Sequence, residues 1–217
     1  MNFFPLLCED YNNISKSSFA KYKEAEDYLK SLNCSSWDHF EHAPEENKKF
    51  EEAYSLRYHS ALTATVFQAL AVEAFINLYG AQRLGEKTYY TEYEKKGATI
   101  EGKMKKICSE YLESQYPTND KAYSRLISLM KKRDKIVHTK PNSVAIDGTR
   151  VSYDDFMSHV NFIYKDLDEE IMSYDILKKN LMKIEGNEID LIQESTNMIQ
   201  NAISEKIIEM LNNGLIG

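Results

Sequence analysis

Glycine and proline are scarce in this sequence. The 217 residues include 8 Gly and 4 Pro, which together make about half of the roughly 12% share that is usual in proteins. β-Sandwiches, β-barrels and enzymes with glycine-rich phosphate loops need more turn residues than this. The chain is 42% hydrophobic and 12% aromatic, so its composition is not that of a disordered protein. The composition therefore predicts an all-α fold.

Cysteines and long apolar runs are also few. The three cysteines, Cys8, Cys34 and Cys108, are odd in number, far apart and without the spacing of a metal site. No stretch reaches the roughly 18 uninterrupted apolar residues of a membrane span, and polar residues interrupt the richest run, 61–79. Residues 1–8 lack the basic lead of a secretory signal. We therefore expect a cytoplasmic protein that makes no contact with a membrane.

The spacing of apolar residues predicts one helical domain over 1–217. Pro44 is a good first residue for a long central helix, and Gly80 is the expected end of that helix. Residues up to about Ser18 are expected to form an irregular arm, and the Asp147-Gly148 turn predicts a small β-hairpin near 143–151. Helices are expected at 18–32, 44–79, 99–112, 119–138 and 152–174, the last continuing to 184, with a final amphipathic helix at 188–211. The buried stripe of the 119–138 helix is expected to be Tyr123, Leu126, Ile127, Met130 and Val137.

The charge of the chain is unevenly distributed. The formal net charge is −7, which argues against a protein that coats itself in nucleic acid. Between Lys95 and Lys140, however, twelve basic residues face only five acidic ones, so this window carries +7 and the rest of the chain −14. A local positive field of this kind suits a phosphate-bearing ligand. The alternative interpretation of this basic window is a solvated, lysine-rich helix face.

The residues most suited to chemistry lie at the end of a predicted helix inside the basic window. Arg133 offers a planar fork that matches a phosphate group, and His138 is a side chain that titrates near neutral pH. Asp134 is four residues before His138, so its carboxylate is expected to orient the imidazole. Arg133 and His138 are separated by about 140° around an ideal helix. They meet at one phosphate only if the last turn loosens or a second copy of the helix supplies the partner.

This Arg-Asp-x-x-x-His string resembles the signature of the HEPN superfamily, in which Arg precedes His by a few residues and a polar residue follows the Arg. The long apolar helix at 61–77, the variable connection after it and the motif helix also follow the order of HEPN domains, over roughly residues 45–175. The resemblance implies an all-α HEPN-like bundle with a C-terminal helical extension at about 176–213. It further implies a homodimer whose motif helices line a shared cleft.

The resemblance implies a metal-independent endoribonuclease of a toxin or phage-defence system, acting on RNA without a cofactor. Arg133 would bind the scissile phosphate, and His138 would activate the ribose 2′-OH or protonate the leaving 5′-oxygen. Asp134 would orient the pair, while Lys132, Lys135 and Lys140 would contact the substrate. In one HEPN toxin subgroup a Tyr that a partner enzyme modifies occupies the position of Lys140, so that form of regulation is in doubt. An antitoxin or another regulatory protein is a further expected partner.

Several alternatives stay open. Glu73 is a secondary catalytic candidate, because a carboxylate on so apolar a helix needs a partner. A structural ion pair is the more common reason for such a residue.

The segment 38–42 contains two His and two acids but has no second ligand cluster, so we predict no metal site. His59 and His159 lie within predicted helices and are expected to be packing or surface residues. The rival to the ribonuclease is a non-catalytic helical interaction or nucleotide-binding module.

Overall fold

A computed structural model describes residues 5–32, 44–94, 98–118, 120–138, 153–186 and 204–206. These residues are mostly helical and include no β-strand, which confirms the all-α class. The hairpin predicted near 143–151 and most of the helix predicted at 188–211 lie outside them. In chain order the elements are α1 (Pro5–Ser31), α2 (Pro44–Leu84), α3 (Glu86–Tyr89), the π-helical turn η1 (Tyr90–Glu94), α4 (Ile100–Glu110), α5 (Lys121–Val137), α6 (Tyr153–Tyr164), α7 (Leu167–Glu170) and α8 (Ser173–Glu185).

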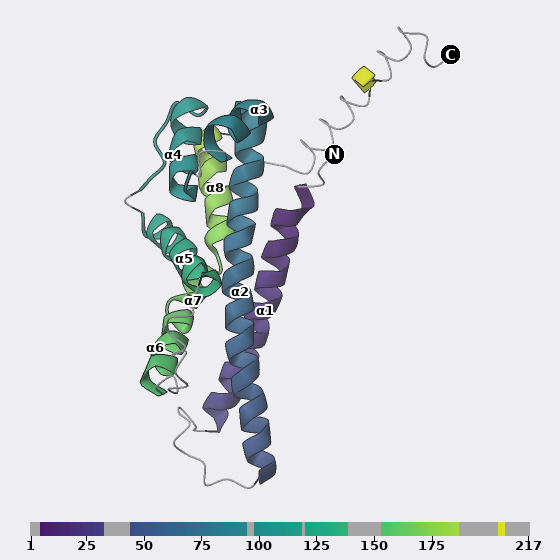
Figure 1. Cartoon of the computed structure of the whole chain (residues 1–217), viewed down its shortest axis with the longest axis vertical. Helices are drawn as coiled ribbons and strands as arrows, with labels where there is room; N and C mark the ends of the chain where they lie inside the picture. The colour runs from purple at the N-terminus through teal and green to yellow at the C-terminus, as the bar shows by residue number, and fades with distance from the viewer. Residues whose placement is uncertain are drawn as a thin grey trace, which may run out of the picture.

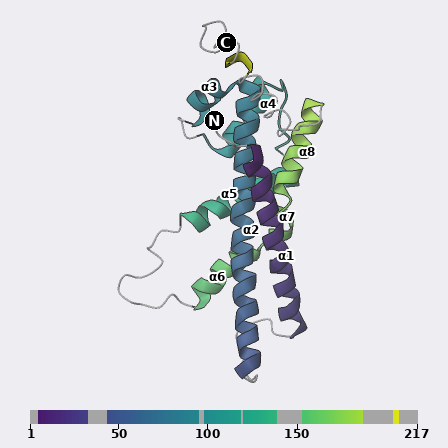
Figure 2. The ribbon, with the colours of Figure 1, turned by 90° about the vertical axis from the view of Figure 1, so that its right-hand side faces the viewer.

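The two longest helices, α1 and α2, lie side by side and run in opposite directions (Figures 1 and 2). The irregular arm predicted up to Ser18 is wrong, because α1 is helical from Pro5 onward. This early part of α1 packs on α2: Cys8 is buried, and the Ser15 hydroxyl donates a hydrogen bond of 2.8 Å to the Ala64 carbonyl. Burial against a neighbouring helix thus stabilises a segment whose own sequence gave only a weak helical signal.

Helix α2 starts at Pro44 as predicted, but it does not end at Gly80. It continues for one more turn to Leu84. The reason for glycine at position 80 is packing: a β-carbon there would collide with the ring of Tyr89, which is fully buried against this part of α2. Gly80 therefore allows the segment after α2 to fold back closely onto it.

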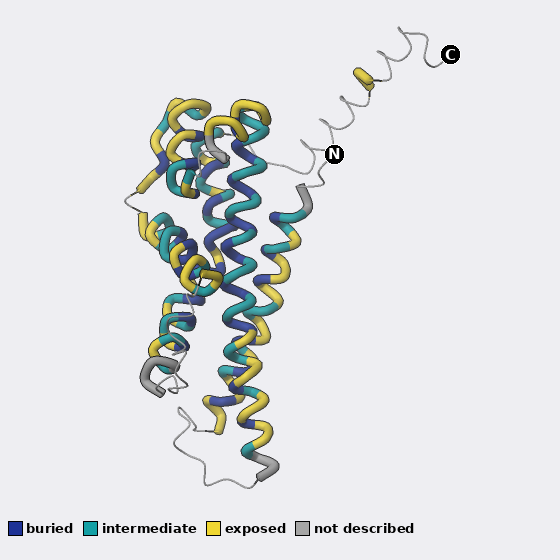
Figure 3. Tube along the Cα trace, viewed as in Figure 1, coloured by how far each residue is buried: buried dark blue, intermediate teal, exposed yellow. Residues whose placement is uncertain are grey.

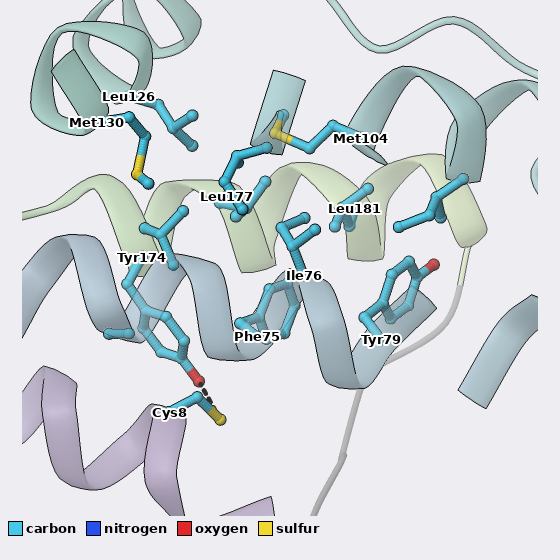
Figure 4. Close-up of a cluster of buried hydrophobic side chains, with 14 of the residues drawn as sticks. Cys8, Phe75, Ile76, Tyr79, Met104, Leu126, Met130, Tyr174, Leu177 and Leu181 are labelled. Carbon is cyan, nitrogen blue, oxygen red and sulfur yellow. Dashed lines mark hydrogen bonds between the residues drawn. The ribbon is translucent and has the colours of Figure 1, made fainter. Parts of the chain in front are cut away.

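The main core surrounds the second half of α2, where the tube in Figure 3 alternates between dark blue and teal. Helices α4, α5 and α8 cover this half, and Figure 4 shows side chains from all of them meeting the residues of α2. The cluster includes Phe75, Ile76 and Tyr79 of α2, Met104 of α4, Leu126 and Met130 of α5, and Tyr174, Leu177 and Leu181 of α8. The prediction that α2 is the central helix of a bundle is confirmed.

The single helix predicted from 152 to 174 is instead broken into α6, α7 and α8. Helix α6 ends at Tyr164, and Asp166 adopts a left-handed conformation with φ 60°. Aspartate tolerates this conformation better than most residues. The break redirects the chain, so that α8 packs along α2 while α6 lies lower in the bundle (Figure 1).

Residues 47–84 of α2 are long and apolar enough to cross a membrane by length and composition alone. Half of the most apolar window of this helix is buried inside the protein. The core helix of a soluble helical protein has the same properties, and the packing of α4, α5 and α8 on α2 fits that description.

Candidate functional site

The predicted catalytic residues lie on the last turns of α5. This helix begins at Lys121 with Asp120 as its cap: the Asp120 carboxylate accepts a hydrogen bond of 3.1 Å from the Ala122 amide. Leu126, Leu129 and Met130 are buried against the core. The helix remains regular to its end, because the His138 amide donates a 2.9 Å bond to the Asp134 carbonyl.

Arg133 lies on the side of α5 that faces α2. Its guanidinium forms an ion pair with Glu73 of α2, and a second ion pair of 2.9 Å with Asp134. The Arg133 side chain is 17% exposed, and its Nε is buried without a hydrogen-bond partner among the residues that the structure describes. The structure thus brings together Arg133 and Glu73, which lie 60 positions apart in the sequence, and supplies the partner that Glu73 was expected to need.

His138 lies apart from this ion pair. It is the exposed residue that caps the C-terminus of α5. Because the last turn does not loosen, the side chains of Arg133 and His138 leave the helix about 140° apart. Within the described part of the chain, no hydrogen bond or ion pair joins the Asp134 carboxylate to the His138 ring, and Asp134 contacts Arg133 instead. A single copy therefore does not direct Arg133 and His138 at one point.

Lys132, which was predicted to contact a substrate, does not face solvent. The residue is 3% exposed, and its ammonium forms an ion pair with Glu170 of α7. The same ammonium donates hydrogen bonds to the carbonyls of Ile163 at 3.2 Å and Lys165 at 2.6 Å. These carbonyls belong to the C-terminal end of α6, where backbone oxygens lack helical partners. Lys132 therefore joins α5 to α6 and α7.

Other basic residues of α5 also meet acids of the α6–α7 corner. Lys121 pairs with Glu169 at 2.7 Å, and Arg125 pairs with Asp166 at 2.6 Å and also with Glu169. Two lysines of helix α4 form ion pairs with acids of the same helix, Lys105 with Glu101 and Lys106 with Glu110. Of the nine basic residues of the window that the structure describes, at least six form ion pairs, and four of these pair with acids from outside the window. Lysines at five described positions of the window are exposed, as the alternative of a solvated helix face expects, whereas Lys103 and Lys132 are buried.

Two further basic residues of α5, Lys131 and Lys135, are exposed. The Lys135 ammonium lies 4.2 Å from the centre of the Phe162 ring of α6. Phe162 follows the half-buried His159 by one helical turn. Burial and, after it, the charge of Lys135 lower the pKa of His159. Sequence reasoning assigned no functional role to His159, because only the fold brings α6 beside the end of α5.

Lys140 and the segment 38–42 lie outside the described residues. Among the residues that are described, no group of three or more His, Cys, Asp or Glu side chains could hold a metal ion. Cys8 and Cys108 are both buried, and burial raises the pKa of each thiol.

Comparison of this chain with models of protein families, with curated proteins and with solved structures finds no match.

Proposed function

We propose that this chain is a metal-independent endoribonuclease of HEPN type. The observation that supports the proposal is the arrangement at the end of α5. Two carboxylates hold the guanidinium of Arg133 at a fixed position, with 17% of the side chain exposed. His138 is exposed on the next turn. A fixed guanidinium and an accessible imidazole are the groups that phosphodiester cleavage without a metal requires.

In this mechanism Arg133 binds the scissile phosphate and stabilises the charge that develops on it. Glu73 and Asp134 position Arg133, and Lys135 contributes positive charge beside the site. The ribose 2′-oxygen attacks the phosphorus, and the bond to the 5′-oxygen breaks. His138 accepts the proton of the 2′-OH or donates one to the leaving oxygen. The products are a 2′,3′-cyclic phosphate and a free 5′-OH, and DNA is spared because it lacks the 2′-OH.

The proposal includes a dimer. Arg133 and His138 diverge by about 140° on one α5, so the two side chains of a single chain do not reach the same phosphate. In a dimer, one copy of α5 would supply Arg133 and the other would supply His138. By resemblance to HEPN proteins, we propose a cytoplasmic toxin or phage-defence role. The regulatory partner would be an antitoxin or a similar protein.

The test is cleavage of total cellular RNA by the purified chain in the presence of a chelator. Wild type should cleave, whereas Arg133→Ala and His138→Ala should lose at least about 100-fold in rate. His59→Ala is a matched control, since His59 is an exposed histidine of α2 whose ring contacts Ser55 at 3.2 Å. Intact RNA after incubation with folded wild type, or undiminished cleavage by His138→Ala, would contradict the proposal.

The second candidate is a non-catalytic helical interaction or nucleotide-binding module. It is favoured by the engagement of Arg133 with two carboxylates and by the burial of Lys132, which leave less charge for a phosphate. Binding of labelled single-stranded RNA, measured by fluorescence anisotropy over a range of salt, separates the candidates. Salt-dependent affinity supports the ribonuclease, and no binding at low salt supports the module.

A further inference from the structure

A second histidine lies beside the end of α5, on α6. The Lys135 ammonium contacts the Phe162 ring at 4.2 Å, and His159 precedes Phe162 by three residues on the same face of α6. Ile136, next to Lys135, packs in one apolar cluster with Phe162 and Ile163. The last turns of α5 and the middle of α6 are thus in contact, and this contact places His159 near Lys135.

His138 is the other histidine near Lys135, and it lies on α5 itself. The two residues are three positions apart on α5, so they are neighbours on one helix face. Both are exposed, and this face does not include Arg133, which turns toward Glu73. Lys135 therefore has one imidazole a turn away on its own helix and a second one across the contact between α5 and α6.

We propose that His138 and His159 of one chain are the acid–base pair of the cleavage reaction, with the Lys135 ammonium between them. This inference rests on the proposed ribonuclease function, in which Arg133 reaches the same phosphate from the second copy of α5, and it names a further catalytic residue for that function. One imidazole takes the proton of the 2′-OH as the 2′-oxygen bonds to phosphorus. The other gives a proton to the 5′-oxygen as the P–O5′ bond breaks. The ammonium of Lys135 stabilises the additional negative charge on the phosphate oxygens.

The environments of the two imidazoles assign their roles. Burial and, after it, the charge of Lys135 lower the pKa of His159, which favours the neutral ring that a base needs. The role of the acid then belongs to His138, the exposed residue at the end of α5. Pairs of titratable groups in contrasting environments are typical of acid–base sites.

Kinetics test this pair directly. His159→Ala and His138→Ala should each lower the cleavage rate at least about 100-fold, and His59→Ala should leave it unchanged. Added imidazole should restore part of the activity of His159→Ala, which it would not do if the residue were only structural. If His159→Ala, or the milder His159→Gln, cleaves within about threefold of wild type while His138→Ala is inactive, the inference is overturned and the ribonuclease function stands.

A binding experiment tests the pair without relying on activity. Uridine 3′-monophosphate is titrated into the full chain, and the histidine ring protons are followed by NMR. We expect the signals of His138 and His159 to shift together at the same concentration, while that of His59 stays in place. A shift of only one of the pair, or of neither, would overturn the inference even if wild type cleaves RNA.

Discussion

The ammonium of Lys132 and the carboxylate of Glu170 form an ion pair in the interior, where the two residues are 3% and 0% exposed. The pair is fully hydrogen-bonded. Lys132 also donates to the carbonyls of Ile163 and Lys165, and Glu170 also accepts a 3.0 Å bond from the Ser128 hydroxyl. Burial raises the pKa of Glu170, and the neighbouring Lys132 opposes that rise. A residue from the basic motif thus fixes the corner of α6 and α7 onto α5.

Removing one partner of this pair should destabilise the fold strongly. Lys132→Met leaves the Glu170 carboxylate buried without its cation, and the expected loss is about 3–5 kcal/mol in the free energy of unfolding. Urea unfolding followed by circular dichroism measures the change. Lys131→Met is the matched control, since Lys131 is exposed and its replacement should alter stability by less than about 0.5 kcal/mol.

The double variant Lys132→Met with Glu170→Leu removes both charges. It should recover much of the loss, because a buried pair replaced by apolar residues is often close to neutral. Equal stability of Lys132→Met and Lys131→Met would show that the ion pair does not hold the α6–α7 corner.

Alanine at two helical glycines should have opposite effects. In Gly80→Ala the new β-carbon collides with the Tyr89 ring, so we expect a loss of about 1–3 kcal/mol. In Gly102→Ala the nearest atom is the Thr99 hydroxyl at 3.4 Å, so the higher helix propensity of alanine should stabilise α4 by about 0.5–1 kcal/mol. Thermal unfolding of both variants checks the signs, and a stabilised Gly80→Ala would mean that Tyr89 is not packed on α2.

Glu26 should contribute to stability in acid. Burial opposes ionisation of its carboxyl, but hydrogen bonds from Lys30, Tyr22 and Lys23 outweigh this effect and lower the pKa to about 2. A lowered pKa in the folded state adds stability above about pH 4.5, and that stability is lost as the pH falls toward 2. In Glu26→Gln this pH-dependent part, about 1–3 kcal/mol, should be missing.

Unfolding of wild type and Glu26→Gln by urea at several pH values between 2 and 7 measures this difference. The exposed Glu24 provides the control, and Glu24→Gln should follow the wild-type curve. Parallel curves for wild type and Glu26→Gln would contradict the prediction.

Local patterns were sufficient for much of the secondary structure. Scarce Gly and Pro predicted helices, Pro44 predicted the start of α2, and apolar spacing predicted the buried Leu126 and Met130 of α5. The same spacing wrongly placed Val137 in the buried stripe; it is 53% exposed. Helical periodicity identifies one apolar face but does not say how far along the helix a neighbour covers it.

The sequence by itself determined that this protein is helical, which helix is central and which residue types stand near Arg133 and His138. Only the tertiary structure decided which charged side chains pair with one another. It paired Arg133 with Glu73, buried Lys132 against Glu170 and brought His159 beside Lys135. These partners are separated by tens of residues, and an ion pair depends on distance in space and on burial. Counting charges along the chain therefore overstated the positive field, because the acids that balance it come from other helices.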